Sequence, residues 1–261
     1  MQIPDDERIA AFDRRFVRAQ ATHVVDLPWG FALLQSDFPL SHYHNRVVVT
    51  AAASAAEIVA AADDVLGGAG LAHRYVSVED DELGQALRAD LVTAGYEHES
   101  TVAMKYSGSD IDSVAHEVCA VSLEALRPAL IREWRIMLPD ATAELLDQLA
   151  DRTGLYSRGA EVTRLVVFDG DVIAAYADLY TDREAQIAQF ENLVTNRNFR
   201  GRGYGGALIR DALRRGRQAG CELSFLTADV DDWPRDWYRR LGYLDTSRAH
   251  NFSSHGATGR I

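Results

Sequence analysis

The sequence contains little cysteine and no long apolar run, and both absences narrow the class of protein. Cys119 and Cys221 are the two cysteines among 261 residues, which is too few for a disulfide framework and typical of a reducing cytoplasm. No apolar stretch approaches the roughly 20 residues that cross a membrane as a helix, and residues 1–18 lack the apolar segment of a signal peptide. With 47% hydrophobic and 25% charged residues, we expect a globular cytoplasmic protein without a membrane partner.

The sequence also has fewer basic than acidic residues, and it has no recognisable metal-binding pattern. The formal net charge is -12, which argues against a nucleic-acid partner and is compatible with a cationic amine as substrate. The eight histidines show no metal-ligand spacing. His42 and His44 would lie on one face of a strand, but no third ligand is near them in the sequence. We therefore expect no metal site.

The chain also lacks a P-loop, because no Gly-x-x-x-x-Gly-Lys-Ser/Thr segment occurs. What it has instead is Arg200-Gly201-Arg202-Gly203-Tyr204-Gly205-Gly206, between a predicted strand (186–195) and a predicted helix (204–218). Glycines let the backbone turn tightly and approach a ligand closely, and the start of a helix offers free N–H groups to a phosphate. Together with the forked donors of Arg200 and Arg202, the segment predicts a diphosphate-binding loop.

The same glycines also satisfy the Gly-x-Gly-x-x-Gly pattern of dinucleotide-binding folds, through Gly201, Gly203 and Gly206. That fingerprint usually opens an early βαβ unit, and an acidic ribose ligand follows about 20 residues later. Here the pattern lies about 60 residues before the end of the sequence, which leaves little room for the rest of such a sheet. The context therefore disfavours a dinucleotide.

Two motifs together resemble the Gcn5-related N-acetyltransferase (GNAT) family. The segment Arg200-Gly201-Arg202-Gly203-Tyr204-Gly205 is similar to the family signature Arg/Gln-x-x-Gly-x-Gly/Ala. The segment Tyr238-Arg239-Arg240-Leu241-Gly242-Tyr243 is similar to the later family element Tyr-x-x-Leu-Gly-Phe/Tyr. The resemblance covers roughly residues 112–252, and it implies an α/β (α+β) fold with a mixed, mostly antiparallel sheet flanked by helices. It also implies acetyl-CoA as cosubstrate.

A faint internal repeat indicates that this unit occurs twice. The two copies are offset by 146 residues at Val47 and by 147 at Gly95, and the predicted strands and helices follow the same order in both. We therefore predict tandem GNAT-like domains, 1–107 and 112–261, of which the second is catalytic. Oligomeric state stays open between monomer and homodimer.

The first half differs from the second at the loop that should bind the cofactor. It has Thr50-Ala51-Ala52-Ala53-Ser54 there, with neither glycine nor arginine, so it cannot turn as tightly or hold a diphosphate. We predict a degenerate domain without coenzyme A that forms one wall of the acceptor cleft, with an unrelated α/β cap as the alternative. Ser107-Gly108-Ser109-Asp110 is the predicted linker.

The resemblance also suggests which elements of the second half contact the acceptor. In this family two helices and their connection lie over the acceptor site, and Trp134, Arg135 and Met137 are at the matching place. Ordinary helix packing is the alternative role for these side chains. The sequence pattern predicts a strand (118–123), two helices (124–137 and 141–153) and a hairpin (161–168 and 172–180) with an Asp-Gly turn.

Acetyl transfer to an amine requires a base, because a free alkylamine with a pKa of about 10 is mostly protonated at pH 7. Glu191 is the carboxylate in the central part of the strand before the loop, on one face with Gln189 and Leu193. We predict Glu191 as the general base, with a structural or orienting role as the alternative. Tyr238 matches the family tyrosine that protonates the departing thiolate, and a core tyrosine is the alternative there.

The resemblance assigns the remaining cofactor contacts. Backbone groups of 193–195 match the stretch that holds the pantetheine arm, and one N–H could polarise the thioester carbonyl. Asn196 stands where relatives often have proline, and Asp231 stands where they often have asparagine. The predicted cofactor-binding residues are Leu193, Val194, Thr195, Arg200, Gly201, Arg202, Gly203, Tyr204, Gly205, Gly206 and Asp231.

The sequence thus predicts an acetyl-CoA-dependent N-acetyltransferase. It would transfer the acetyl group to a primary amine of a small molecule by direct attack in a ternary complex. The alternatives are a coenzyme A-responsive binding or regulatory module without turnover, or an acyltransferase that acts on a protein N-terminus. The identity of the acceptor and the preferred acyl-chain length are not determined by these motifs.

Overall fold

One continuous sheet of eleven strands organises the molecule. The computed structural model describes residues 3–108 and 116–255. The order across the sheet is β1-β2-β3-β4-β11-β5-β10-β9-β8-β7-β6. β3 pairs with β4 and β9 with β10 in parallel, whereas the other neighbours are antiparallel. The strands are β1 (His23–Leu27), β2 (Gly30–Leu34), β3 (Arg46–Val49), β4 (His73–Val78), β5 (Glu97–Tyr106), β6 (Cys119–Val121), β7 (Glu161–Asp169), β8 (Val172–Asp182), β9 (Ile187–Thr195), β10 (Leu223–Asp229) and β11 (Tyr243–His255).

Helices flank this sheet, so the predicted α/β class with a mixed, mostly antiparallel sheet is confirmed. The predicted helix 204–218 is α6, and the strand before it is β9. Local chemistry explains several boundaries: Ser54 and Glu57 form a capping box at the start of α2, and Gly170 takes a φ of 60° in the β7–β8 turn. The helices are α1 (Asp5–Gln20), α2 (Ala55–Ala62), α3 (Asp81–Thr93), α4 (Leu123–Met137), α5 (Ala143–Asp151), α6 (Tyr204–Gln218) and α7 (Pro234–Arg240), with short turns η1 (His42–His44), η2 (Asp63–Gly67), η3 (Arg152–Arg158) and η4 (Arg197–Phe199).

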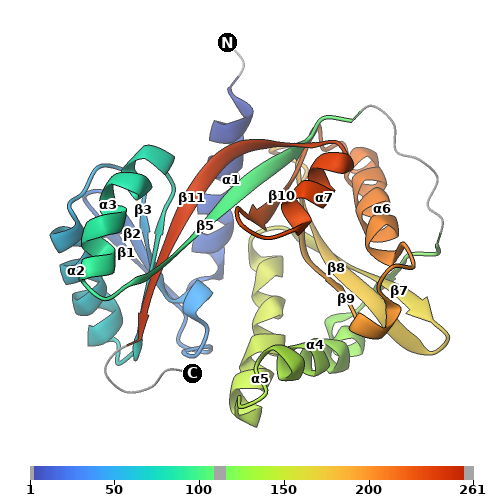
Figure 1. Ribbon diagram of the computed structural model, residues 1–261, viewed down its shortest axis with the longest axis horizontal. Coiled ribbons are helices and arrows are strands. Elements are labelled where there is room, and N and C mark those ends of the chain that lie inside the picture. The colour runs from blue at the N-terminus through green and yellow to red at the C-terminus, as the bar shows by residue number, and fades with distance from the viewer. Residues whose placement is uncertain (1–2, 109–115, 256–261) are drawn as a thin grey trace.

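The two halves of the chain exchange their last strands. β5 ends the first half, yet it pairs with β10 of the second half, from Thr101 opposite Asp229 to Lys105 opposite Phe225. β11 ends the second half, yet it lies between β4 and β5 of the first. In Figure 1, β5 and β11 run side by side from one lobe to the other. The sheet is therefore not divided at 107–112, where the sequence predicts the boundary between two domains, and that boundary stays a prediction. Ser109 and Asp110 of the predicted linker lie outside the described residues.

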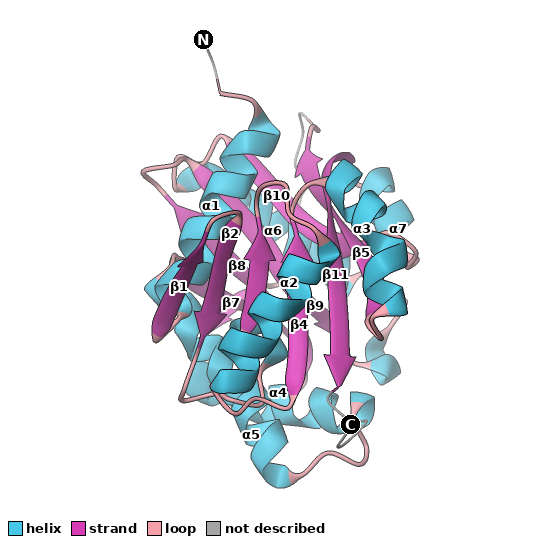
Figure 2. Ribbon diagram, turned by 90° about the vertical axis from the view of Figure 1, so that its left-hand side faces the viewer, coloured by secondary structure: helices cyan, strands magenta, loops and turns pink. Residues whose placement is uncertain are grey.

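Helix α1 was not predicted from the sequence, and it joins the two halves. Ile9, Phe12 and Phe16 pack in one cluster with residues of β2 and β3 on one side and of β8 and β10 on the other. In Figure 1 the helix lies between the lobes. Figure 2 shows α2 and α3 in front of the strands of the first half, with α1 behind them. The first half thus has helices on both faces of its strands, and α1 also covers strands of the second half.

The cofactor-loop side of the second half has its own core. Leu208, Ile209 and Ala212 of α6 pack against β7, β8, β9 and β10 in a cluster that also contains Met104 of β5. The exchanged strand thus supplies a side chain to the core that supports the predicted loop. Among the described residues, no helix is long and apolar enough to cross a bilayer.

Candidate active site

Strands β9 and β10 diverge at Glu191. Their parallel pairing ends at Phe190 opposite Leu226, and β9 is bulged at Asn192, which has a φ of 56°. Past this point the backbone N–H of Thr227 donates to Oε1 of Glu191, at 2.9 Å, instead of pairing with β9. The divergence leaves backbone groups at the end of β9 without a partner on β10, so an extended ligand can pair with them.

The glycine-rich loop follows β9 and ends at the start of α6. Gly201 and Gly203 have φ values of 77° and 85°, in the left-handed region that glycine adopts without strain. The first hydrogen bond of α6 runs from the Ala207 N–H to the Gly203 carbonyl, at 3.0 Å. The N–H groups of the first turn therefore have no intrahelical partner, and no side chain of the described residues caps this end. This geometry suits a phosphate group.

A cavity of about 640 Å³ connects the loop with the end of β9, α4 and α7. A coenzyme A arm fits such a space in chemistry as well as size, because the loop supplies free N–H groups and the walls are largely apolar. A Cβ at Gly205 would come within 3.2 Å of the Trp237 ring, so the loop needs glycine where it passes α7. The lining residues are Glu133, Ile136, Met137, Leu193, Val194, Thr195, Arg197, Phe199, Arg200, Gly201, Gly203, Tyr204, Gly205, Gly206, Trp233, Pro234, Trp237 and Tyr238.

The cavity thus brings together most of the predicted cofactor residues with Tyr238 and Met137. Arg200 lies at its edge, exposed, with Nε 3.3 Å from the Thr195 carbonyl oxygen. Trp233 and Trp237 also line the cavity and were not predicted. Trp233 directly precedes α7 and Trp237 lies in its first turns, four residues later. Residues at this spacing lie on the same side of a helix, and this pattern could have indicated both from the sequence.

Five predicted residues do not line this cavity, and two of them, Arg135 and Glu191, are described separately below. Arg202 pairs with Asp169 of the β7–β8 turn, at 2.7 Å, so its guanidinium does not point at the loop interior. Asp231 is exposed between β10 and α7. Trp134 packs within the apolar clusters of α4 and α5, with the Arg152 guanidinium 5.5 Å from its ring centre. Trp134 thus takes part in helix packing, and its role as an acceptor contact stays a prediction.

Arg135, the other acceptor-contact candidate on α4, is used in a local contact. Its Nη1 donates to the carbonyl oxygen of Ala141, at 2.9 Å. The contact links the end of α4 to the start of α5, where the chain turns. Of the three candidates on this helix, Met137 is the one that reaches the cavity, with 64% of its surface exposed.

Glu191 has the electrostatics of a base that works near neutral pH. Burial raises its pKa to about 7, and the nearby charge of Asp178 acts in the same direction. The side-chain amide of Gln189 and the Thr227 N–H both donate to Oε1, each at 2.9 Å, and they limit the rise. Both ionisation states of Glu191 are therefore accessible around pH 7.

Tyr238 is held in the protonated state. It is 8% exposed, and burial together with the charges of Glu191 and Asp232 raises its pKa above the ordinary value. Its ring centre lies 5.2 Å from that of Trp237 and 6.0 Å from that of Tyr243. A hydroxyl that keeps its proton and lines the cavity can donate that proton to a leaving group.

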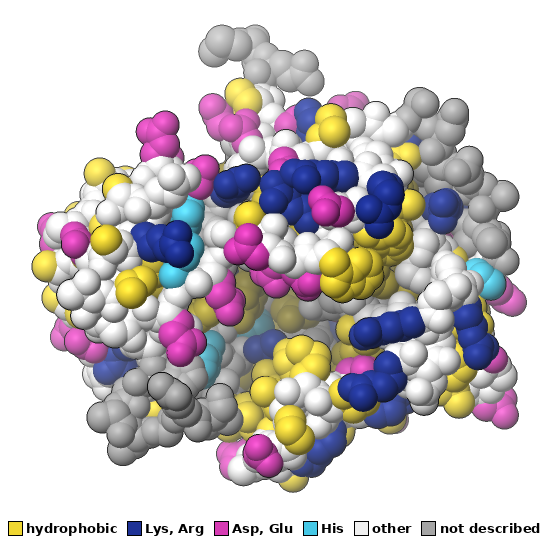
Figure 3. Space-filling model, in the orientation of Figure 1, with side chains coloured by type: hydrophobic (Ala, Val, Ile, Leu, Met, Phe, Trp, Pro, Cys, Tyr) yellow, Lys and Arg dark blue, Asp and Glu magenta, His cyan; other side chains and the backbone are white. Residues whose placement is uncertain are grey.

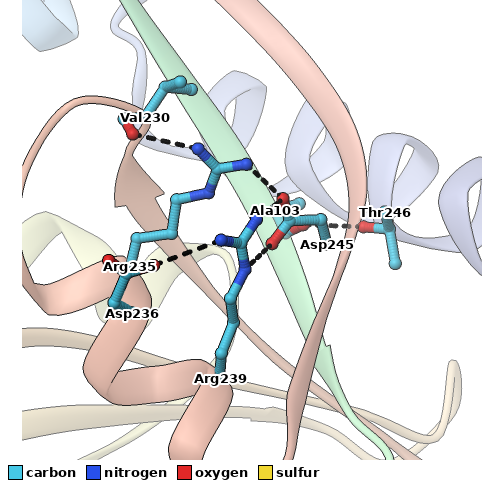
Figure 4. A network of polar contacts seen from close by, with 7 residues as sticks. All are labelled: Ala103, Val230, Arg235, Asp236, Arg239, Asp245 and Thr246. Atoms are coloured by element: carbon cyan, nitrogen blue, oxygen red, sulfur yellow. Dashed lines mark hydrogen bonds and ion pairs between the residues drawn. The ribbon is translucent and has the colours of Figure 1, made fainter.

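Helix α7, which carries Tyr238, is fixed to the exchanged strand β11. Arg239 pairs with Asp245 of β11 at 2.7 Å, and Arg235 pairs with the same carboxylate. Arg235 also donates to the Val230 carbonyl at 3.0 Å, and Figure 4 shows this network reaching Thr246 beside β5. The orientation of Tyr238 therefore depends on strands from both halves.

Residues 123–243 match the model of the acetyltransferase (GNAT) family. No curated protein matches the sequence significantly. Solved structures are similar over nearly the whole chain. A GCN5-related N-acetyltransferase from Kribbella flavida is 18% identical with a TM-score of 0.64, over 98% of both chains. A conserved protein of unknown function from Staphylococcus epidermidis is 15% identical with a TM-score of 0.65, over 90% of this chain and 94% of the other.

A tandem GNAT protein from the clavulanic acid biosynthesis pathway has the same two-part arrangement. It is 13% identical with a TM-score of 0.58, over 98% of this chain and 97% of the other. At sequence identities this low, the similarity to solved structures establishes the fold alone. The match to the family model establishes that the second half belongs to the family. The chain therefore has the fold of tandem GNAT proteins throughout, and its second half belongs to the acetyltransferase (GNAT) family.

Proposed function

We propose that the protein transfers the acetyl group of acetyl-CoA to a primary amine of a small molecule, by direct attack in a ternary complex. The observation that carries the proposal is the divergence of β9 and β10 at a half-buried carboxylate, Glu191, on the strand that leads into a glycine-rich helix start. The divergence provides an open strand for a pantetheine arm, and the helix start suits its diphosphate. Membership of the second half in the acetyltransferase (GNAT) family agrees with this chemistry.

Each group then has one role in the reaction. The N–H groups of the first turn of α6 hold the diphosphate, and backbone groups of 193–195 hold the pantetheine arm and polarise the thioester carbonyl. Glu191 takes the proton from the amine as its nitrogen bonds to the carbonyl carbon. Tyr238 gives its proton to the sulfur as the carbon–sulfur bond breaks, so no covalent enzyme intermediate is needed.

Calorimetric titration with acetyl-CoA, followed by thiol release across a panel of amines, tests the proposal. We expect binding near one equivalent and release of coenzyme A with a subset of amines. Binding without release on any amine would favour a coenzyme A-responsive module instead. If acetyl-CoA did not bind, the proposal would be wrong, because acetyl-CoA is its acetyl donor.

The left-handed backbone at Gly203 provides a test of the loop. Gly203→Ala should weaken acetyl-CoA binding about tenfold or more, because alanine is strained by about 1–2 kcal/mol at this φ and the loop must shift to relieve it. Gly220→Ala is the matched control, since Gly220 has nearly the same φ, 84°, at the other end of α6. Calorimetry should find that Gly220→Ala binds acetyl-CoA with the wild-type affinity. An equal loss of acetyl-CoA affinity in both variants would indicate a folding defect.

The acid role of Tyr238 has its own test. Tyr238→Phe should lower kcat by about 10²-fold while acetyl-CoA affinity stays within about twofold, because only the hydroxyl is removed. Tyr243→Phe is the control, as Tyr243 is 1% exposed and has no role in the proposed reaction. Stopped-time thiol-release assays at saturating substrates measure both, and a wild-type kcat in Tyr238→Phe would remove the tyrosine from the mechanism.

A further inference from the structure

Helix α1 of the first half passes over strand β9 close to Glu191. The Phe12 ring meets Phe225 of β10 edge-on at 5.9 Å, and the Phe16 ring stacks on Tyr180 of β8 at 5.0 Å. β9 lies between β8 and β10 in the sheet. The segment 12–16 therefore crosses above β9.

Gln189 marks the point of β9 that this segment covers. It is in register with Tyr180 on β8 and with Phe225 on β10, the two residues that contact α1. Its amide nitrogen donates to Oε1 of Glu191 at 2.9 Å. Asp13 lies between the two phenylalanines on α1, so a carboxylate of the first half is brought to the surroundings of the predicted base.

A second cavity, of about 110 Å³, lies at this junction and is lined by both halves. Asp13 and Glu79 form its wall from the first half, and Thr227 of β10 is part of its wall from the second. The backbone N–H of Thr227 is the group that donates to Glu191, at 2.9 Å. One hydrogen bond thus connects the wall of this cavity with the predicted base, and the volume suits the end of a small molecule rather than a cofactor.

One carboxylate of this cavity has no ion-pair partner among the described residues, although the exposed Arg248 also lines the cavity. Glu79 pairs with Arg14 at 2.6 Å, whereas Asp13 has no hydrogen bond or ion pair to any residue within 3–108 and 116–255. Burial, together with the charges of Glu191 and Glu79, raises the pKa of Asp13 to about 8, while the charge of Arg46 acts in the opposite direction. A neighbouring cation would reverse this rise and hold Asp13 ionised.

A buried acceptor without a donor gives a second and independent sign of a ligand. Gln189 is 7% exposed, and its Oε1 has no hydrogen-bond partner among the described residues. Buried polar atoms normally have a partner, and an orphaned one calls for an explanation. Because its amide nitrogen is already bonded to Glu191, an amine beside Glu191 could donate a hydrogen bond to Oε1.

We propose that Asp13 binds a second positively charged group of the acceptor, so that the substrate is a molecule with two cationic centres. One amino group lies beside Glu191 and Gln189 and is acetylated, while the other stays on Asp13. The inference rests on the proposed function and adds a residue of the first half to substrate recognition. In Figure 3 the face between the lobes is hollowed, and both acidic and basic side chains lie along its edge.

Matched acceptors test the proposal. Linear diamines from 1,3-diaminopropane to 1,6-diaminohexane are compared with the monoamine and the amino alcohol of equal length, by thiol release and by calorimetric binding in the presence of coenzyme A. In the wild type, kcat/KM for the best diamine should exceed that of its monoamine by tenfold or more. In Asp13→Asn the diamine should lose about tenfold, while the monoamine and the affinity for acetyl-CoA stay unchanged.

Asp6→Asn is the control variant, because Asp6 is an exposed carboxylate on the same helix; it should keep the wild-type preference. The proposal is overturned if no diamine is preferred over its monoamine in the wild type, or if Asp13→Asn lowers both equally. The binding measurement separates this failure from that of the proposed function. If a diamine binds through Asp13 but is not acetylated, the cation site is supported and the proposed function is not. If monoamines and diamines are acetylated equally well, the proposed function is supported and the cation site is not.

Discussion

Replacing Glu191 with glutamine should lower kcat by about 10²- to 10⁴-fold, the contribution usual for a positioned general base. Glutamine keeps the volume of the side chain and an oxygen that can accept from the Thr227 N–H and the Gln189 amide, both 2.9 Å away in the wild type. What it loses is the ability to take a proton. The affinity for acetyl-CoA, measured by calorimetry, should therefore stay within about twofold.

The pH profile of the wild type gives the same prediction a second readout. Since the pKa of Glu191 is about 7 in the folded protein, the carboxyl is protonated and inactive as a base below that pH. The rate should rise about tenfold per pH unit below pH 7 and flatten above it. Glu191→Gln should lack this rise, because it has no group that titrates there.

Glu222→Gln serves as the control, as Glu222 is an exposed carboxylate just before β10. It should keep both the wild-type kcat and the wild-type pH profile. A Glu191→Gln enzyme that turned over at the wild-type rate, or that kept the rise near pH 7, would show that another group removes the proton. Asp13 would then be the first alternative, since its pKa is also raised into this range.

The glycine-rich loop could be predicted from the sequence because its physics is local. Positive φ at Gly201 and Gly203, and a helix that begins directly afterwards, depend on a few consecutive residues. The directions of long side chains depend on distant partners instead. Arg202 turns to Asp169, which is 33 residues earlier in the chain, and no local pattern indicates that choice.

Helix α1 shows a different limit. Ile9, Phe12 and Phe16 recur at helical spacing, so an amphipathic helix over the first 20 residues could have been predicted from them. Its position between the halves could not, because the same apolar face would pack equally well on either one alone. The contribution of Asp13 to the site becomes visible only once the helix is placed across β9.

The exchange of β5 and β11 could not be predicted from the sequence either. The two strands occupy equivalent places in the repeat, so the pattern allows each of them to pair with β4 or with β10. Its consequence is testable. A fragment of residues 112–261 lacks β5, so β10 has no antiparallel partner and β11 loses both of its neighbours, β4 and β5. We expect this fragment not to fold into the native domain.

The energy of the lost contacts supports that expectation. Val102 and Met104 of β5 are 1% and 0% exposed in the core beneath α6, and Phe12 and Phe16 of α1 cover the opposite face. Burying each such side chain contributes about 1.5–3 kcal/mol. Four of them together are comparable with the whole stability of a typical domain, about 5–15 kcal/mol.

Circular dichroism and calorimetry on the isolated fragment measure the outcome. We expect no cooperative thermal transition and no binding of acetyl-CoA. Co-expression with a fragment of residues 1–111 should restore both, because it returns β5 and α1 to the places they take in the intact sheet. The co-expressed pair also distinguishes a missing partner from damage caused by the cut itself. The contradicting result would be a fragment that melts cooperatively as a monomer and binds acetyl-CoA with the affinity of the full chain. The exchanged strand would then be dispensable. The second half would be an autonomous acetyltransferase domain, to which the first half adds only acceptor contacts.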